Sequence, residues 1–160
     1  MTRDVLVVVG AGGMGLAVAR RCGSGMQVVL ADVTDSVLDA ASAPLREEGH
    51  DVTTHRTDVT DRTSVDDLAE VASRLGPVRA VVHTAGLSPV QAPADAVIAV
   101  DLLGAASVLD AFGRVVSPGG AGVVIASMAG HLMPPMPAVD EAAIAGATPS
   151  DLGSLACVTA

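Results

Sequence analysis

The sequence predicts an α/β fold, a Rossmann-type doubly wound parallel sheet whose five recognisable strands lie in the order 3-2-1-4-5. Short apolar runs alternate with helical segments along residues 5–126, and a glycine-rich turn follows the first run. Half of the 160 residues are hydrophobic, yet Phe112 is the only aromatic residue. Small aliphatic side chains suit helices that pack closely on a parallel sheet, so composition and alternation favour the same fold.

The elements follow one another in strict order. Val5–Val9 is a β-branched run, as a strand covered on both faces requires, and the glycines after it lead into a helix over 16–21. Further strands are expected at 27–31, 51–56, 79–83 and 122–126, and further helices at 36–48, 63–75 and 94–116. Right-handed crossovers between parallel strands then give the order 3-2-1-4-5.

The alternation stops after Ser127. Only 138–145 has a helical pattern in the remaining segment, and no sixth strand is recognisable. We therefore expect residues 1–130 to form a nucleotide-binding Rossmann domain that is incomplete at its C-terminus. Residues 131–160 are expected to form a flexible excursion of loops and one short helix.

Charge and composition exclude several kinds of partner. The formal net charge is −9, so nucleic acid and acidic membranes should be repelled. No apolar run is expected to approach the roughly 20 residues that span a bilayer, and the first residues lack a signal-peptide pattern, which predicts a cytoplasmic protein. Cys22 and Cys157 are too few and too scattered for a disulfide scaffold or a metal site, so we expect reduced, structural thiols and no bound metal.

The turn Gly10-Ala-Gly12-Gly13-Met14-Gly15 matches Gly-x-Gly-x-x-Gly, after a strand and at the start of a helix. The first glycine permits the tight turn, the second lets backbone N–H groups approach a pyrophosphate, and the third lets the helix pack against the strand. The N-terminus of that helix adds a partial positive charge. This pattern predicts a dinucleotide site, and the alternative is a glycine-rich turn with no ligand.

Asp32 ends the second strand about 20 residues beyond the glycine turn, where an acidic side chain meets the adenosine ribose hydroxyls. A 2′-phosphate would meet this carboxylate at close range, and neither the turn nor Val33-Thr34 offers a basic residue. We therefore expect NAD rather than NADP. The alternative is that Asp32 caps the following helix, although Asp35 is better placed for that.

Two further segments follow strands. Asp58-Val59 follows the third strand and His83-Thr84-Ala85-Gly86 follows the fourth. Together with the glycine turn and the stretch Ile125-Ala-Ser-Met-Ala-Gly130, they resemble the short-chain dehydrogenase/reductase family over residues 5 to about 130. The resemblance implies that Asp58 and Val59 flank the adenine. It also implies that Thr84, Ala85 and Gly86 stand in the family's Asn-Asn-Ala-Gly segment, of which Ala85 and Gly86 are retained.

The resemblance also assigns catalytic positions. Ser127 aligns with the serine whose hydroxyl binds the substrate oxygen, whereas a serine after a strand is otherwise more often a turn residue. Asp101 stands where the family often has Asn. It is either a member of a proton relay or a solvated helix residue with no catalytic role. The glycine turn is one residue shorter than the family's usual turn.

The family's Tyr-x-x-x-Lys motif has no counterpart, because the sequence contains neither Tyr nor Lys. His131 is the only nearby substitute acid, although a lone loop histidine is usually solvated.

The preferred interpretation is an NAD-dependent oxidoreductase that transfers hydride between nicotinamide and an alcohol or carbonyl substrate, present here as a truncated and by itself inactive portion. The alternatives are a non-catalytic NAD-binding or sensing module, and another enzyme class on the same fold. Apolar residues spread around the helix over 94–116, which predicts a homo-oligomer or self-association through it.

Overall fold

The computed structural model describes residues 2–159. The chain divides into two compact units, Met1–Val124 and Ile125–Ala160. The boundary between them falls within the range 1–130 that the sequence pattern assigns to one domain.

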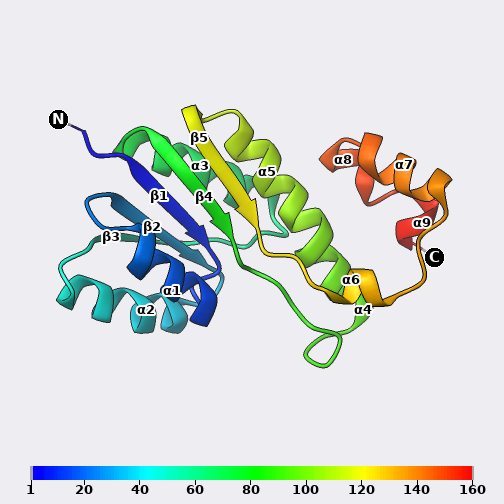
Figure 1. Ribbon diagram of the computed structural model, residues 1–160, viewed down its shortest axis with the longest axis horizontal. Coiled ribbons are helices and arrows are strands. Elements are labelled where there is room, and N and C mark those ends of the chain that lie inside the picture. Colours follow the sequence, from blue (N-terminus) through cyan, green and yellow to red (C-terminus); the bar gives the residue numbers. More distant parts are fainter. Residues whose placement is uncertain (1, 160) are drawn as a thin grey trace. The chain divides into compact units, whose positions relative to one another are not determined.

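The first unit is built on a five-stranded parallel sheet. Its strands are β1 (Val5–Val9), β2 (Gln27–Asp32), β3 (Asp51–Arg56), β4 (Val78–His83) and β5 (Val116–Val124). They lie in the order β3-β2-β1-β4-β5, which Figure 1 shows and which confirms the predicted fold class. The chain winds away from β1 in both directions, so the carboxyl ends of β1 and β4 flank the point where the strand order reverses.

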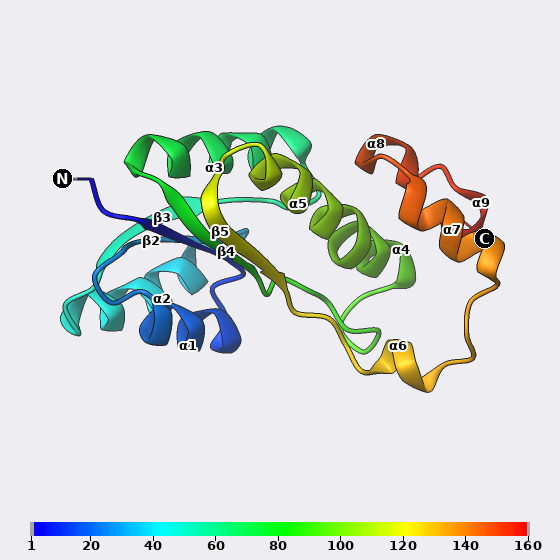
Figure 2. The ribbon, with the colours of Figure 1, turned by 45° about the horizontal axis from the view of Figure 1, so that its top comes forward.

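Helices cover both faces of this sheet (Figure 2). Helices α1 (Gly13–Cys22) and α2 (Asp35–Glu47) pack on one face, and α3 (Arg62–Leu75) and α5 (Ala105–Gly113) pack on the other. Alternate residues of β1 serve the two cores: Val5, Val7 and Val9 face α3 and α5, whereas Leu6 and Val8 face α1 and α2. All five are almost completely buried, which explains why the strand reads as an unbroken apolar run.

The long helical stretch before β5 has three parts. Helix α4 (Ala94–Val97) continues into a π-helical segment η1 (Ile98–Gly104) and then into α5. The stretch ends at Gly113, not at Val116 as the sequence pattern predicts. Val116 instead begins β5.

The bounds of β5 were predicted wrongly at both ends. The sequence pattern places the strand over 122–126, but it runs from Val116 to Val124. Val116 pairs with Val78 and Ala121 pairs with Ala80, so the register shifts between these two pairs. The Pro-Gly-Gly segment that reads as a turn lies in this irregularity, and a proline is tolerated there because β5 is an edge strand.

One helical stretch corrects another expectation. The 20 residues Ala94–Gly113 are long and apolar enough to cross a membrane by length and composition, and an 18-residue window within them has a mean hydropathy of 1.8. This stretch contradicts the expectation that no apolar run approaches the length of a membrane span. A mostly buried core helix passes the same test, but here only 28% of the window is buried, with Val108, Ala111 and Phe112 in the core of the sheet.

The second unit is helical within its described residues. It contains α6 (Ala129–Leu132), α7 (Ala138–Gly146), α8 (Pro149–Leu152) and α9 (Ala156–Thr159). Helix α7 confirms the helix predicted over 138–145. The other three helices have four residues each, which is too short for apolar periodicity to reveal them in the sequence.

Candidate functional site

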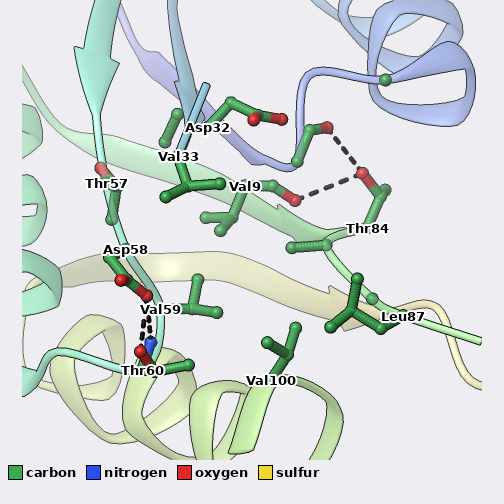
Figure 3. Close-up of a pocket in the computed structure, with 15 residues that line it drawn as sticks. Val9, Asp32, Val33, Thr57, Asp58, Val59, Thr60, Thr84, Leu87 and Val100 are labelled. Carbon is green, nitrogen blue, oxygen red and sulfur yellow. Dashed lines mark hydrogen bonds between the residues drawn. The ribbon is translucent and has the colours of Figure 1, made fainter. Parts of the chain in front are cut away.

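A cleft of about 470 Å³ opens at the carboxyl ends of β1, β2, β3 and β4 in the first unit (Figure 3). Most of its walls are backbone and small aliphatic side chains, with four hydroxyl or carboxylate side chains besides Asp32. Its lining residues are Val9, Gly10, Gly12, Ala31, Asp32, Val33, Thr57, Asp58, Val59, Thr60, Thr84, Ala85, Gly86, Leu87 and Val100. The position agrees with the rule that open α/β sheets bind ligands outside the carboxyl ends of their strands.

The outer glycines of the turn are required by the fold itself. Gly10 has φ +94°, and a Cβ there would lie 2.4 Å from the backbone nitrogen of Ala85. A Cβ on Gly15 would lie 1.9 Å from the carbonyl oxygen of Gly10. Any larger residue at either position would therefore force the turn, β4 and α1 apart.

Gly12 differs from these two residues. It has φ −67° and precedes the first residue of α1, and a Cβ there would meet nothing within 4 Å. Because Gly12 also lines the cleft, a side chain would occupy the space in front of the helix. Packing does not explain this glycine, but the approach of a ligand to the backbone would.

The first turn of α1 faces this space with unsatisfied donors. The first N–H groups of any helix lack intrahelical partners, and Gly12 provides no side-chain cap. The first turn contains no acidic residue, whereas Arg20 and Arg21 lie in the last turn. Gly13 and Met14 begin the helix, and the Met14 side chain is exposed. This helix end suits an anion.

Asp32 links the end of β2 to the glycine turn. Its Oδ2 accepts a hydrogen bond from the Ala11 N–H at 2.9 Å, and its Oδ1 accepts one from the Thr34 N–H at 3.0 Å. Helix α2 begins at Asp35 after Thr34, whose side chain makes no capping bond. Asp32 therefore does not act as the N-cap of α2.

Asp58 and Val59 form the wall of the cleft opposite the glycine turn. Asp58 Oδ1 accepts hydrogen bonds from the Thr60 hydroxyl at 2.7 Å and from the Thr60 N–H at 2.9 Å, which Figure 3 shows. These bonds hold the pKa of Asp58 below its usual value. Val59 is buried, and Asp61 rather than Asp58 caps α3.

The segment after β4 is fastened to the end of β1. The Thr84 hydroxyl lies 2.7 Å from the Gly10 carbonyl oxygen and 3.2 Å from that of Val9 (Figure 3). The Ala85 N–H donates to Val9 at 2.9 Å, and Gly86 completes this wall of the cleft. The fold thus brings Thr84, Ala85 and Gly86 beside the glycine turn.

His83 and Asp101 lie next to this segment. His83 is 2% exposed and neither ring nitrogen has a hydrogen-bond partner among the described residues. Burial lowers the pKa of His83, and the negative charge of Asp101 opposes this in part. Asp101, in η1, accepts a hydrogen bond from the Leu87 N–H at 2.8 Å. Its carboxylate therefore anchors the loop that carries Leu87, a role that the sequence analysis did not anticipate.

Ser127 and His131 belong to the second unit. Ser127 follows the end of β5 by three residues, and its Oγ accepts a hydrogen bond from the Ala129 N–H at 3.1 Å. Both side chains are exposed, and His131 lies in α6. Within residues 2–159, no group of three or more His, Cys, Asp or Glu residues could hold a metal ion.

Sequence reasoning missed several residues of the cleft. Thr57, Thr60 and Leu87 line it, and each directly follows or adjoins a segment that had been singled out. Their position just beyond the carboxyl ends of β3 and β4 was the available signal.

This sheet order, the glycine turn and the cleft beside it define a Rossmann-type α/β protein. A family model described as short chain dehydrogenase matches residues 3–147. The chain belongs to the short-chain dehydrogenase/reductase family, which confirms the resemblance drawn from the sequence. Members of this family are oxidoreductases that bind a dinucleotide cofactor and small-molecule substrates.

Individual relatives agree with this assignment. The short-chain dehydrogenase/reductase bsc3 of Alternaria brassicicola is 39% identical over 133 residues, which are 83% of this chain and 48% of that protein. A Burkholderia phymatum short-chain dehydrogenase/reductase solved with NAD is 32% identical, with a TM-score of 0.74 over 88% of this chain and 54% of that one. The chain spans about half the length of these relatives.

The cofactors named in solved relatives differ. Besides the Burkholderia phymatum protein with NAD, an actinorhodin polyketide ketoreductase variant was solved with NADPH. It is 28% identical, with a TM-score of 0.69 over 88% of this chain and 59% of that one. The family comparison therefore supports a nicotinamide dinucleotide without selecting between the two.

Proposed function

We propose that this chain is the NAD-binding portion of an oxidoreductase that transfers hydride between nicotinamide and an alcohol or carbonyl substrate. The observation that carries the proposal is the open space in front of Gly12 and the α1 N-terminus, inside a cleft lined by Asp32 and Asp58. A bound dinucleotide would supply the hydride acceptor or donor. The residues of the chain would bind and orient it.

Each predicted cofactor residue has a task in this proposal. The glycine turn and the first residues of α1, Gly13 and Met14 among them, receive the pyrophosphate on backbone N–H groups. The free Oδ2 of Asp58 and the apolar Val59 flank the adenine. The wall formed by Thr84, Ala85 and Gly86 guides the cofactor toward the nicotinamide end.

The preference for NAD over NADP rests on charge. Asp32 lines the cleft, and none of the lining residues is Arg or Lys. A 2′-phosphate near this carboxylate would be repelled by its negative charge. NAD has only hydroxyl groups at that position, and these can donate to the carboxylate.

For the catalytic site, we propose Ser127 as one residue and Asp101 as a second. Ser127 would hold the substrate oxygen, and Asp101 would act through the Leu87 loop or through bound water. The chain contains no Tyr and no Lys, so the proton exchange that the family performs with these residues requires groups outside these 160 residues. We therefore propose that the chain alone binds NAD but does not turn over substrate, and that residues 1–130 are its nucleotide-binding domain.

The alternative function, a non-catalytic NAD-binding or sensing module, is favoured by the same absence of Tyr and Lys. The two functions can be distinguished by adding the C-terminal portion of a full-length relative as a separate chain. If this chain is part of an enzyme, the mixture should reduce a carbonyl substrate with NADH; if it is a non-catalytic module, it should not. We also propose that the chain self-associates through the helical stretch 94–113, most of which is not buried, and that it is cytoplasmic.

The test of the proposed function is to titrate the full chain with NAD and with NADP. Binding is measured by calorimetry, and the melting temperature is measured with and without each ligand. We expect NAD to bind and to raise the melting temperature by mass action, and NADP to do so less. Equal binding of the two would contradict the argument from Asp32. No binding of either would refute the proposed function.

A further inference from the structure

Asp32 makes two backbone hydrogen bonds that its expected contact with ribose does not explain. One joins it to Ala11, which lies 21 residues earlier and inside the glycine turn. The other joins it to Thr34, beyond the end of β2. One carboxylate thus holds the turn that follows β1 against the end of the neighbouring strand.

The Ala11 N–H has particular need of this partner. Ala11 is 3% exposed, so its backbone donor cannot turn to solvent if the carboxylate is removed. A buried N–H without a partner is strongly disfavoured, and the turn would rearrange to avoid one. The carboxylate is therefore part of what fixes the turn.

Through the residues next to Ala11, this bond also fixes where α1 begins and therefore where a phosphate would bind. The Gly10 N–H donates to the Ala31 carbonyl at 2.7 Å, so two consecutive turn residues are tied to the end of β2. Gly12, the residue before α1, follows immediately. The direction in which the first N–H groups of α1 point then depends on where Ala11 is held.

The carboxylate can do this and still receive a ligand. An ionised carboxylate offers about four lone-pair positions, and only two are used by Ala11 and Thr34. Two positions remain for hydroxyl donors from the side of the cleft, which Asp32 lines (Figure 3). The two roles are compatible and separable.

We propose that Asp32 is a positioning residue for pyrophosphate binding, because it clamps the glycine turn through Ala11, in addition to the ribose contact expected of it. This inference rests on the proposed function. It implies that replacing Asp32 to admit NADP weakens the site for every adenosine diphosphate ligand. Cofactor preference in this chain could then not be reversed at this position alone.

The test uses a ligand that has no ribose hydroxyls. The full chain, Asp32→Ala and Asp32→Asn are titrated with 2′,3′-dideoxyadenosine 5′-diphosphate and with ADP. Asp39→Ala, an exposed aspartate within α2, is the matched control. We expect Asp32→Ala to weaken the dideoxy ligand at least 10-fold, Asp32→Asn to weaken it less because the amide keeps one acceptor oxygen, and Asp39→Ala to leave it unchanged.

A contact with ribose alone predicts the opposite pattern. It would weaken ADP binding in both Asp32 variants but leave the dideoxy ligand unaffected, and that result overturns the clamp. Failure of the unaltered chain to bind ADP and NAD would refute the proposed function instead.

Amide hydrogen exchange gives a readout that does not depend on any ligand. The Ala11 amide should exchange faster in Asp32→Ala, which has no acceptor for it, than in the unaltered chain, while the amides of the β1 strand stay protected. Unchanged protection of Ala11 in Asp32→Ala overturns the clamp. If Asp32→Ala does not fold, Asp32→Ser, whose hydroxyl is too short to reach Ala11, carries both measurements.

Discussion

Replacing Gly12 by Val separates ligand binding from folding, which replacing Gly10 or Gly15 in the same turn would not do. The backbone at Gly12, with φ −67° and ψ −167°, is extended and open to any residue, and a Cβ there meets nothing within 4 Å. Because Gly12 is the N-cap of α1, where Val is less favourable than Gly, the substitution should cost about 1 kcal/mol in the free energy of unfolding. The side chain would nevertheless fill the space that a phosphate needs.

Two companion substitutions should behave in the opposite way. Gly15→Ala places a methyl group 1.9 Å from the Gly10 carbonyl oxygen, and Gly10→Ala adds a clash with Ala85 to a positive φ. Overpacking of this kind costs about 1–3 kcal/mol or more. At about 4 °C per kcal/mol, a conversion suited to a domain of this size, each should lower the melting temperature by roughly 4–12 °C.

The assay is thermal unfolding of the full chain with and without NAD. A ligand at 100 times its dissociation constant stabilises the folded state by about 2.7 kcal/mol, so the unaltered chain should gain roughly 10 °C. Without NAD, Gly12→Val should melt only about 4 °C below the unaltered chain, and NAD should not raise its melting temperature. Gly113→Ala, another glycine with open space around its Cβ, is the matched control and should keep the gain. A full NAD shift in Gly12→Val would refute the reasoning.

Three further outcomes follow from the first unit. Because burial lowers the pKa of His83, the unfolded chain binds more protons than the folded one once the pH falls below about 6.5. Stability should therefore decline from pH 7 toward pH 5, and His83→Asn should flatten this decline in urea titrations; an unaltered slope would contradict it. Phe112 is 3% exposed in the core, so Phe112→Ala should cost about 3–5 kcal/mol by the same measurement, and a loss below 1 kcal/mol would show a poorly packed core. Arg62 pairs with Asp110 across α3 and α5, but both side chains are exposed, so Arg62→Ala should shift the urea midpoint far less than Phe112→Ala and still less at high salt.

Local patterns were sufficient for most of the fold. The β-branched run Val5–Val9 and the glycine turn were predictable because a buried parallel strand needs continuous apolar residues and a dinucleotide turn needs glycines at fixed spacing. The alternation of strands and helices then left few topologies, since crossovers are right-handed. The strand order followed without any knowledge of contacts.

The same local patterns misplaced β5. Pro118 and the glycines after it predict a turn, and they do interrupt the pairing, but the edge position of the strand tolerates them. Whether such a segment is a turn or an irregular strand depends on its neighbour β4, which the local sequence does not describe. Pairing with β4 also decides where β5 ends, and therefore how many residues separate its end from Ser127.

The sequence by itself determined which residues can approach a phosphate, because Gly12 and the helix start are adjacent in the chain. Only the tertiary structure decided what holds them there. The Asp32 bond to Ala11 spans 21 residues and the Asp101 bond to Leu87 spans 14. Packing also leaves both ring nitrogens of His83 without a hydrogen-bond partner among residues 2–159. These features depend on which strands and helices become neighbours, and hydrogen bonds between segments far apart in the chain leave no periodic signal in the sequence.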